Sequence, residues 1–502
     1  MAVLGLDVGT SGCKGTLLDE TGNALAAAHH EYNAPAGALE LHPDALWQGL
    51  RFVLQRIAQL AKEQRQPIQA VCVSSFGETF VLLDKQGRVL QPAMMYTDPR
   101  GTEESAQLAE RFGLESVVQR TGAFPHPMYS LPKWMWLATH RPQVWQAIDR
   151  VCLIGDYVLY LLGGVHAIDR SLAARSMALD ITVLEWDTAL LDMVGLRKEQ
   201  LSTVYPSGTL VGEISPHVAQ ELGLPAGIQL VTGGHDQVCA ALGAGVVCAG
   251  TAVDGMGSVE CMTPAFDAPL RARQDAFACI PHGVPGMYVT YAFNFTGGVM
   301  LKWFRDQLAP EVHAAAQRMG GDAYEELGRQ AEALADGPTG LLVLPHFAGA
   351  GTPSMDVSAT GAIVGLTLGT SRAQLYRAVM EGTAMEMRWN LDCLARMGIA
   401  PDTIHVVGGG AKSPLWMQIK ADIYNRPVST LRLDEAGTMG TAMLAWYALG
   451  VYPTLADAAK ACVRVKRVYE PRKDMAARYG EQYARYCRMQ AGVKGIMMQT
   501  TM

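Results

Sequence analysis

A glycine-rich turn between two short apolar runs occurs once in each half of the chain. Near the N-terminus, residues 3–7 form a run with strand character, Gly9-Thr10-Ser11-Gly12 form a turn, and residues 14–18 form a second strand-like run. The same strand, Gly-Ser turn and strand return at residues 253–261, after another strand-like run at residues 228–231. Alternation of strand and helix patterns is typical of α/β domains. We therefore predict two α/β domains joined near residue 245.

The segments around these turns also alternate between predicted helices and predicted strands. Residues 45–63 place Leu46, Leu50, Val53, Leu54, Ile57 and Leu60 at helical spacing, and residues 68–74 form a buried strand. In the second half we expect helices at 299–307, 323–335, 371–397 and 414–424, and strands at 340–345 and 403–407. After about Lys466 we expect a terminal helix with a loose tail. The predicted units are residues 1–245, 246–455 and 456–502.

Composition excludes several classes of protein. With 502 residues, 49% hydrophobic and 18% charged, the chain has ample apolar surface for folded cores. The net charge of −7 and the lack of a dense basic patch argue against a nucleic-acid partner. We expect no membrane domain, because glycines interrupt the long low-charge stretch at 238–253. Asp7 interrupts the first apolar run and the ten cysteines form no CxxC pair, so we expect a cytoplasmic protein with reduced thiols.

The first turn carries the residue types that a polyphosphate with Mg²⁺ requires. Asp7 ends a strand and offers a metal-binding oxygen, while Thr10, Ser11 and the turn backbone offer hydrogen bonds, and Lys14 adds positive charge. This pattern differs from the Walker loop between strand and helix. The alternative is an ordinary hairpin with a glycine-rich turn.

Two segments near the predicted domain seam add to this hypothesis. Gly257-Ser258 repeats the turn in the second half, where it would grip a phosphate chain from the other side of a cleft, unless it is only a common Gly-Ser turn. Asp236 follows a strand and a glycine pair, so it is a candidate general base for a hydroxyl proton, with Gln237 orienting the same hydroxyl. The alternative is that Asp236 caps the helix that begins at Gln237.

The remaining candidates concern the nucleotide base and the acceptor. Residues 408–413 place three glycines, Ala411 and Ser413 between a strand and a helix, where bare backbone can face an adenine, or where the chain only makes a tight turn. Ser75, Glu78 and Asp98 are candidates for binding a polyol acceptor. Alternatively, Asp98 and Arg100 pair with one another in a turn.

Taken in order, these segments resemble the FGGY family of carbohydrate kinases. The most specific match is residues 361–366, then a seven-residue gap, then residues 374–381, which fits the family's C-terminal signature. Residues 409–413 resemble its adenosine segment, and residues 7–14 its first phosphate motif. Further collinear matches, among them Ala174-Arg175-Ser176 and Gly297-Gly298, extend the resemblance over about residues 3–450. It implies two ribonuclease H-like domains, the actin and Hsp70-like ATPase fold, with a cleft between them.

The resemblance also implies roles for individual residues. Asp236 corresponds to the catalytic base, and Asp7 and Asp236 are the implied magnesium ligands. The implied ATP contacts are Asp7, Thr10, Ser11, Lys14, Gly257, Ser258, Gly297, Gly298, Gly409, Gly410, Ala411 and Ser413. The candidate acceptor contacts are Ser75, Glu78, Asp98, Asp236 and Gln237, of which Asp236-Gln237 and Glu78 resemble segments of family members. The chain departs from the family at Gly257-Ser258-Val259-Glu260, where Gly-Thr-Ser-Gly is usual, and at Ser75-Phe76-Gly77-Glu78, where xylulokinase-like members have Gln-Met-His-Gly.

The predicted function is ATP- and Mg²⁺-dependent phosphorylation of a primary hydroxyl of a small sugar, a ketopentose such as xylulose. Glycerol, erythritol or a hexulose are alternative acceptors in the same family. An alternative of another class is an actin-like or Hsp70-like nucleotide-driven binding protein. By analogy with relatives, the resemblance also suggests a homodimer.

Overall fold

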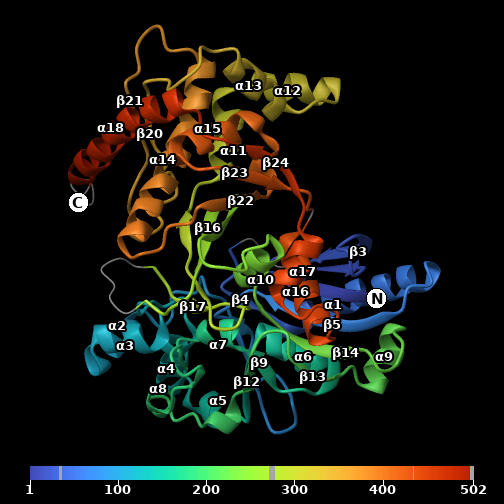
Figure 1. Ribbon diagram of the computed structural model, residues 1–502. Helices are drawn as coiled ribbons and strands as arrows, with labels where there is room; N and C mark the ends of the chain where they lie inside the picture. Colours follow the sequence, from blue (N-terminus) through green and yellow to red (C-terminus); the bar gives the residue numbers. More distant parts are fainter. Residues whose placement is uncertain (33–36, 271–276, 434, 498–502) are drawn as a thin grey trace.

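The computed structural model describes residues 1–32, 37–270, 277–433 and 435–497. Figure 1 shows two α/β halves, with the N-terminal strands in the lower half and most of the C-terminal elements in the upper half. The predicted α/β character is therefore confirmed. Part of the predicted loose tail, residues 498–502, lies outside the described residues.

The first half is built on a six-stranded sheet. Its central strands β1, β5 and β14 are parallel, because the chain leaves the sheet and returns between them. β2 and β3 continue antiparallel from β1, and β13 pairs antiparallel with β14 at the other edge. The order is β13 (Leu210–Glu213), β14 (Gln229–His235), β5 (Ile68–Ser75), β1 (Ala2–Val8), β2 (Gly12–Leu18) and β3 (Ala24–Glu31).

The second half repeats this arrangement in an eight-stranded sheet. β15 and β16 form an antiparallel hairpin, and β22 and β23 continue parallel from β15. The order is β17 (Ile280–Pro281), β18 (Tyr288–Val289), β16 (Glu260–Phe266), β15 (Thr251–Met256), β22 (Thr403–Val407), β23 (Val428–Leu431) and β24 (Val465–Tyr469), with β19 (Ala292–Asn294) also on β16. In both sheets the predicted glycine turn joins the hairpin next to the parallel strands.

Smaller sheets and helices complete the two halves. The smaller sheets are β4 (Glu40–Leu41), β7 (Ala93–Met94), β6 (Phe80–Leu83) and β8 (Arg150–Leu153); β9 (Ala167–Asp169) with β12 (Thr203–Tyr205); β10 (Leu179–Asp180) with β11 (Glu185–Trp186); and β20 (Leu342–Leu344) with β21 (Ala362–Val364). The helices of the first half are α1 (Pro43–Glu63), α2 (Thr102–Phe112), α3 (Leu114–Thr121), α4 (Ser130–His140), α5 (Pro142–Gln146), α6 (Ile154–Gly163), α7 (Arg170–Ala174), α8 (Thr188–Asp192), α9 (Pro216–Leu222) and α10 (Asp236–Gly243). Those of the second half are α11 (Gly298–Leu308), α12 (Pro310–Met319), α13 (Ala323–Glu332), α14 (Arg372–Arg396), α15 (Pro414–Tyr424), α16 (Ala436–Ala448), α17 (Leu455–Cys462) and α18 (Lys473–Met497).

Strand β1 shows how the two faces of the first sheet are covered. Its residues alternate between faces, as in any strand. Leu4 and Leu6 belong to one buried cluster with the apolar side of α1, whereas Val3 belongs to another with α16. Gly5 also faces α16, where a β-carbon would overlap the backbone of Thr438. The late helices α16 and α17 therefore lie against the first half (Figure 1), and the domain division at residue 245 stays a prediction.

The C-terminal segment contains a strand that the sequence pattern did not predict. Residues Val465–Tyr469 form β24, which pairs antiparallel with β23 at the edge of the second sheet. Four of its five side chains are exposed, so the segment lacks the apolar signal of a buried strand. The predicted terminal helix follows as α18, whose buried Tyr479 and Tyr486 donate hydrogen bonds to Glu381 and Glu386 of α14.

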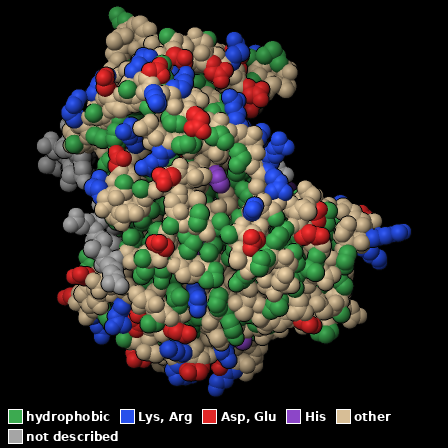
Figure 2. Space-filling view, in the orientation of Figure 1, with side chains coloured by type: hydrophobic (Ala, Val, Ile, Leu, Met, Phe, Trp, Pro, Cys, Tyr) green, Lys and Arg blue, Asp and Glu red, His purple; other side chains and the backbone are tan. Residues whose placement is uncertain are grey.

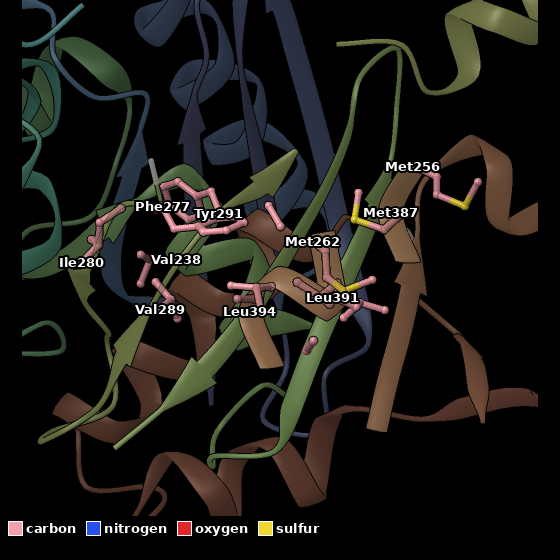
Figure 3. Close-up of a cluster of buried hydrophobic side chains, with 14 of the residues drawn as sticks. Val238, Met256, Met262, Phe277, Ile280, Val289, Tyr291, Met387, Leu391 and Leu394 are labelled. Carbon is pink, nitrogen blue, oxygen red and sulfur yellow. The ribbon is translucent and has the colours of Figure 1, made fainter. Parts of the chain in front are cut away.

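The largest buried cluster runs through both halves. Val238 of α10 belongs to the same apolar cluster as Met256, Met262 and Tyr291 of the second half. Figure 3 shows these side chains with Met387 and Leu391 of α14. Because apolar burial is the main driving force for such packing, the space between the sheets is partly filled by shared core. The site must therefore lie beside this core.

The surface and the cysteines agree with the composition. On the face in Figure 2, Lys and Arg side chains are interspersed with Asp and Glu. Across the described ranges, none of the helices combines the length and apolar character needed to cross a membrane. The ten cysteines are thiols and not disulfides, and seven of them are buried.

Candidate active site

A cavity of about 650 Å³ is lined by the first glycine turn and by residues of both halves. The first half contributes the residues of the first glycine turn and those that follow β14. The second half contributes residues of β16 and of the segment around β19. The lining includes Asp7, Thr10, Ser11, Lys14, Glu78, Asp236 and Gln237 from the first half and Val259, Cys261 and Tyr291 from the second. The structure thus brings seven of the predicted site residues to one pocket.

The first turn is held by its own backbone and by α16. Asp7 and Lys14 face one another across the β1–β2 hairpin, and the Gly9 N–H donates to the Gly12 carbonyl at 2.8 Å. Ser74 Oγ donates to Asp7 Oδ1 at 3.0 Å, while Lys14 Nζ donates to Glu435 Oε1 at 2.8 Å. Burial raises the pKa of Asp7, and Ser74 and Lys14 oppose that rise. A partly buried carboxylate beside a turn of this kind provides oxygen ligands that a divalent cation prefers.

The second turn is fixed by hydrogen bonds to the start of α11. The Gly297 and Gly298 N–H groups donate to the carbonyls of Ser258 and Gly257 at 2.9 and 2.8 Å. A β-carbon on Gly298 would lie 2.7 Å from the Gly257 carbonyl oxygen, so the close approach requires glycine. The second turn therefore keeps a defined shape although its sequence departs from the family pattern.

The predicted adenosine segment lies beside this second turn. A β-carbon on Gly410 would lie 2.6 Å from Cε of Met256, the last residue of β15. A β-carbon on Gly409 would meet no atom within 4 Å, so its backbone faces open space. The Ala411 N–H donates to the Gly408 carbonyl, and Ser413 Oγ caps α15. The predicted residues of the second half thus form one group, which adjoins the lining of the cavity through Val259.

Asp236 is the first residue of α10 and faces the cavity with 32% of its side chain exposed. Oδ1 accepts a hydrogen bond from the N–H of the next residue, Gln237, at 2.6 Å. A helix cap would instead accept from an N–H two or three residues further on, and no side chain of the described residues caps α10, so the capping alternative is wrong. Burial, and then the charges of Asp7 and Glu78, raise the pKa of Asp236 to about 7. A carboxylate with a pKa near neutrality can act as a general base.

The structure also places residues in the pocket that the sequence analysis did not select. Arg175, which follows α7, turns its guanidinium to Glu78 across 97 positions of sequence. His235 Nδ1 lies 2.7 Å from the hydroxyl of Tyr291, a contact between the two halves. Burial and the charge of Arg175 lower the pKa of His235 well below its usual value, so the imidazole is neutral. Arg175 lies within a segment that resembles the family, which is the one signal that points to it.

Two predicted acceptor residues lie outside the lining of this cavity. Ser75 is buried at the end of β5, where its hydroxyl donates to the Phe76 carbonyl at 3.1 Å. Asp98 is buried and accepts two hydrogen bonds from the Arg100 side chain and one from the Arg100 N–H. That arrangement is the turn pair expected as the alternative. Their roles as acceptor contacts stay predictions.

The carboxylates of the cavity suit a magnesium ion that is held mainly by phosphate. Asp7 and Asp236 both line the cavity, and each is buried enough for its pKa to be raised. Among the described residues, there is no group of three or more His, Cys, Asp and Glu side chains suited to a metal. Magnesium bound with nucleotide needs only one or two carboxylates, because phosphate and water supply the other oxygens. The donor set therefore fits the ion.

The chain matches known carbohydrate kinases along most of its length. Residues 2–243 match the N-terminal domain of the FGGY family of carbohydrate kinases, and residues 256–449 match its C-terminal domain. Xylulose kinase of Bacillus subtilis (strain 168) is 28% identical over 480 residues, which are 95% of this chain and 94% of that protein. Autoinducer-2 kinase of Yersinia pseudotuberculosis serotype O:3 (strain YPIII) is 32% identical over 493 residues, with coverage of 95% and 92%.

A solved structure gives the same result for the fold. The crystal structure of xylulose kinase from Rhodospirillum rubrum has a TM-score of 0.90 and 28% identity, and the match covers 99% of this chain and 100% of that one. The predicted two-domain actin and Hsp70-like ATPase fold is thereby confirmed, as is a phosphotransferase activity on a carbohydrate. Kinases of this family use ATP as the phosphoryl donor. This chain belongs to the FGGY family of carbohydrate kinases.

Proposed function

We propose that this kinase transfers the γ-phosphoryl group of ATP to a primary hydroxyl of a small sugar, and that the acceptor is a ketopentose such as xylulose. The observation that carries the proposal is the shared cavity of Asp236 and the first turn. A base must reach the acceptor hydroxyl while the phosphate-binding groups hold the donor next to it. One cavity lined by both kinds of residue meets that requirement.

The residues of the cavity take separate roles in this proposal. The acceptor hydroxyl gives its proton to Asp236 while its oxygen forms a bond to the γ-phosphorus, and the bond from that phosphorus to the leaving ADP oxygen breaks. Thr10, Ser11 and Lys14 bind the phosphate oxygens. To do so, the Lys14 ammonium leaves the Glu435 carboxylate and binds phosphate in its place. Asp7 and Asp236 would hold Mg²⁺, which neutralises charge on the phosphates when it is bound.

The nucleotide base is assigned to the second half. Gly409, Gly410, Ala411 and Ser413 would contact the adenosine, because the backbone at Gly409 faces open space beside the second turn. Gly257, Ser258, Gly297 and Gly298 would hold the phosphates from that side, since their hydrogen bonds fix the turn in place. The N–H groups of Gly257, Gly297 and Gly298 already donate to carbonyls of the turn, so they fix its shape and do not themselves bind phosphate.

Both the named relatives and the residues of the cavity support a ketopentose as the acceptor. Proteins named xylulose kinase and others named autoinducer-2 kinase resemble this chain over more than nine tenths of its length. Glu78, Asp236 and Gln237 offer polar contacts for hydroxyl groups in the cavity. Glycerol, erythritol, a hexulose and autoinducer-2 are therefore the competing acceptors.

A panel of acceptors tests the assignment. We would measure ADP formation by the full chain with D-xylulose, D-ribulose, D-fructose, glycerol, erythritol and autoinducer-2, and without acceptor. The expected result is the highest kcat/KM with a ketopentose, and loss of activity with EDTA that Mg²⁺ restores. A higher kcat/KM with another acceptor would replace the ketopentose. ATP hydrolysis without any stimulation by an acceptor would favour the nucleotide-driven binding protein.

The location and assembly of the protein are proposals of the same kind. A cytoplasmic location is supported by ten cysteines that form no disulfide, since disulfides are rare in reducing compartments. A homodimer is supported only by analogy with relatives. Cell fractionation and light scattering on the purified chain test the two proposals.

A further inference from the structure

We propose that the paired charges of Glu78 and Arg175 make the acceptor end of the cavity selective for neutral polyhydroxyl compounds, and exclude acceptors that carry a carboxylate, such as aldonic acids. This inference rests on the proposed function, because it names the acceptor class of the same pocket. It adds Arg175 as a residue that determines specificity.

The pair leaves one acceptor atom and one donor atom for a ligand. Arg175 Nε donates to Glu78 Oε1 at 2.6 Å, and Nη2 donates to the same oxygen. Both side chains line the cavity, and they are 6% and 5% exposed. Within the described part of the chain, Glu78 Oε2 and Arg175 Nη1 take part in no hydrogen bond. A hydroxyl both donates and accepts, so it suits these two atoms.

The surroundings hold the pair in place. The Arg175 guanidinium lies 5.0 Å from the ring centroid of Tyr129 and 5.6 Å from that of Tyr291, so aromatic faces contact it. Glu78 has a φ of 64°, which is uncommon for a residue other than glycine and is kept only where the surroundings hold it. Ser130 Oγ donates to the Glu78 carbonyl at 2.7 Å and supports this backbone. The pair is therefore preorganised for a ligand.

The charges behind the pair are balanced. Burial raises the pKa of Glu78, and Arg175 and Lys133 oppose that rise. Lys133 is buried, and its ammonium group donates to the carbonyls of Pro127 and Met128. Its charge and that of Arg100 are offset by Asp98 and Glu40, which both accept from Arg100. No net positive charge is thus left at this end to receive an anion.

This balance discriminates between acceptor classes. A ligand carboxylate would meet a guanidinium already neutralised by Glu78, with Asp7 and Asp236 elsewhere in the same cavity. Bringing a desolvated anion to such a site is costly, because its charge stays unpaired. The hydroxyl groups of a neutral sugar meet both a donor and an acceptor instead. A site built for hydroxyl groups rejects ligands that cannot satisfy it.

The test compares ketoses with aldonates of equal chain length. We would measure binding of D-xylulose, D-xylonate, D-fructose and D-gluconate to the full chain by calorimetry without ATP. We expect the wild type to bind each ketose at least 100-fold more tightly than its aldonate. Glu78→Gln keeps an oxygen for Arg175 but leaves the guanidinium charge free. In this variant, the ratio of the affinity for the ketose to the affinity for the aldonate should fall at least tenfold.

Two further variants separate specificity from folding. Glu381→Gln makes the same change at a buried glutamate of the second half, whose Oε1 lies 3.5 Å from Arg377 Nε. Its ratio of ketose affinity to aldonate affinity should equal that of the wild type. If Glu78→Gln does not fold, Arg175→Met removes the cation instead. We expect this variant to bind the aldonate no better than the wild type does.

The outcomes distinguish this inference from the proposed function. Equal binding of ketose and aldonate by the wild type, or an unchanged ratio in Glu78→Gln, would overturn the inference. A gain in aldonate binding by Arg175→Met would overturn it as well. Selective ketose binding without any phosphorylated product would contradict the proposed function and leave the specificity standing. Failure of the wild type to bind any of the four compounds would contradict both.

Discussion

Arg175 passes directly over Gly77: a β-carbon on Gly77 would lie 2.9 Å from both Cβ and Cγ of Arg175. The same β-carbon would lie 3.0 Å from Cδ2 of His235. Side chains in close-packed surroundings do not tolerate such distances without moving. A glycine at position 77 is therefore what allows the guanidinium to reach Glu78, far away in the sequence, and to line the cavity.

The first prediction follows from this contact. Gly77→Ala should displace Arg175 and lower kcat/KM for the acceptor about tenfold or more, while KM for ATP changes less than about twofold, because the displaced group lies at the acceptor end. Steady-state kinetics with each substrate varied in turn measures both values. Gly328→Ala is the control, since a β-carbon there meets no atom within 4 Å. Unchanged acceptor kinetics in Gly77→Ala would mean that Arg175 does not contact the acceptor.

A second prediction concerns the buried cation beneath the second turn. Lys420 Nζ donates to Asp254 Oδ2 at 2.7 Å, to Glu260 Oε1 and to Tyr424. Lys420→Met leaves two buried carboxylates without a cation, so the free energy of unfolding should fall by about 3–5 kcal/mol. Urea denaturation followed by circular dichroism measures it. The exposed Lys412→Met should stay within about 0.5 kcal/mol of the wild type. An equal midpoint for Lys420→Met would show that the cluster adds nothing to stability.

A third prediction uses the pH dependence of stability. Asp156 is buried at the start of α6, and burial raises its pKa to about 8, although Ser202 opposes the rise. Its pKa in the unfolded chain is about 3.9. Because the folded state binds this proton more tightly, the stability contribution is complete below about pH 4 and is lost as the pH rises toward 8. The free energy of unfolding of Asp156→Asn, relative to that of the wild type, should therefore rise by about 1 kcal/mol for each pH unit between pH 5 and 7.

Denaturation at several pH values checks this sign. Asp84→Asn is the matched control of opposite sign, because the backbone N–H of Arg88, with other hydrogen bonds, lowers the pKa of Asp84. Its carboxylate stabilises the fold at neutral pH, and that contribution is lost as the pH falls through the lowered pKa. If the two variants showed parallel pH profiles, Asp156 would not be the buried acid described above.

A fourth prediction concerns the contact between α10 and α16, which joins the halves. A β-carbon on Gly440 of α16 would overlap the Cys239 carbonyl of α10. Gly440→Ala should therefore lower the free energy of unfolding by about 1–3 kcal/mol, because the helices must separate. Gly480→Ala in α18 meets no atom within 4 Å and should be neutral or slightly stabilising, since alanine favours helix. Thermal unfolding of the two variants measures the difference. Equal melting temperatures would contradict a tight contact between Gly440 and the Cys239 carbonyl.

Elements with strong local signals were predictable from the sequence. The strand Thr403–Val407 and the helix Pro414–Tyr424 have the predicted bounds, because an apolar run, a glycine turn and a capping Ser-Pro pair define them locally. The buried face of α1 was predictable from helical spacing for the same reason. In contrast, β24 is polar and is a strand only because it pairs with β23.

The site could be predicted only as separate motifs. The Asp7 turn and Asp236 are recognisable because each follows a strand and lies next to glycine. The contact of Glu78 with Arg175, and that of His235 with Tyr291, depend on the folded chain and have no local pattern. The packing of α16 against β1 likewise depends on glycines whose partners lie in the other half.

The central claim is that Asp236 accepts the proton of the acceptor hydroxyl in the cavity that also holds the phosphates. The most direct measurement is acceptor-dependent ADP formation by Asp236→Asn, with Asp180→Asn, at the end of β10 and outside the cavity lining, as a control. The account predicts that Asp236→Asn loses about 10²–10⁴ in kcat while it still binds ATP, and that Asp180→Asn is unaffected. Turnover by Asp236→Asn at the wild-type rate would contradict the account.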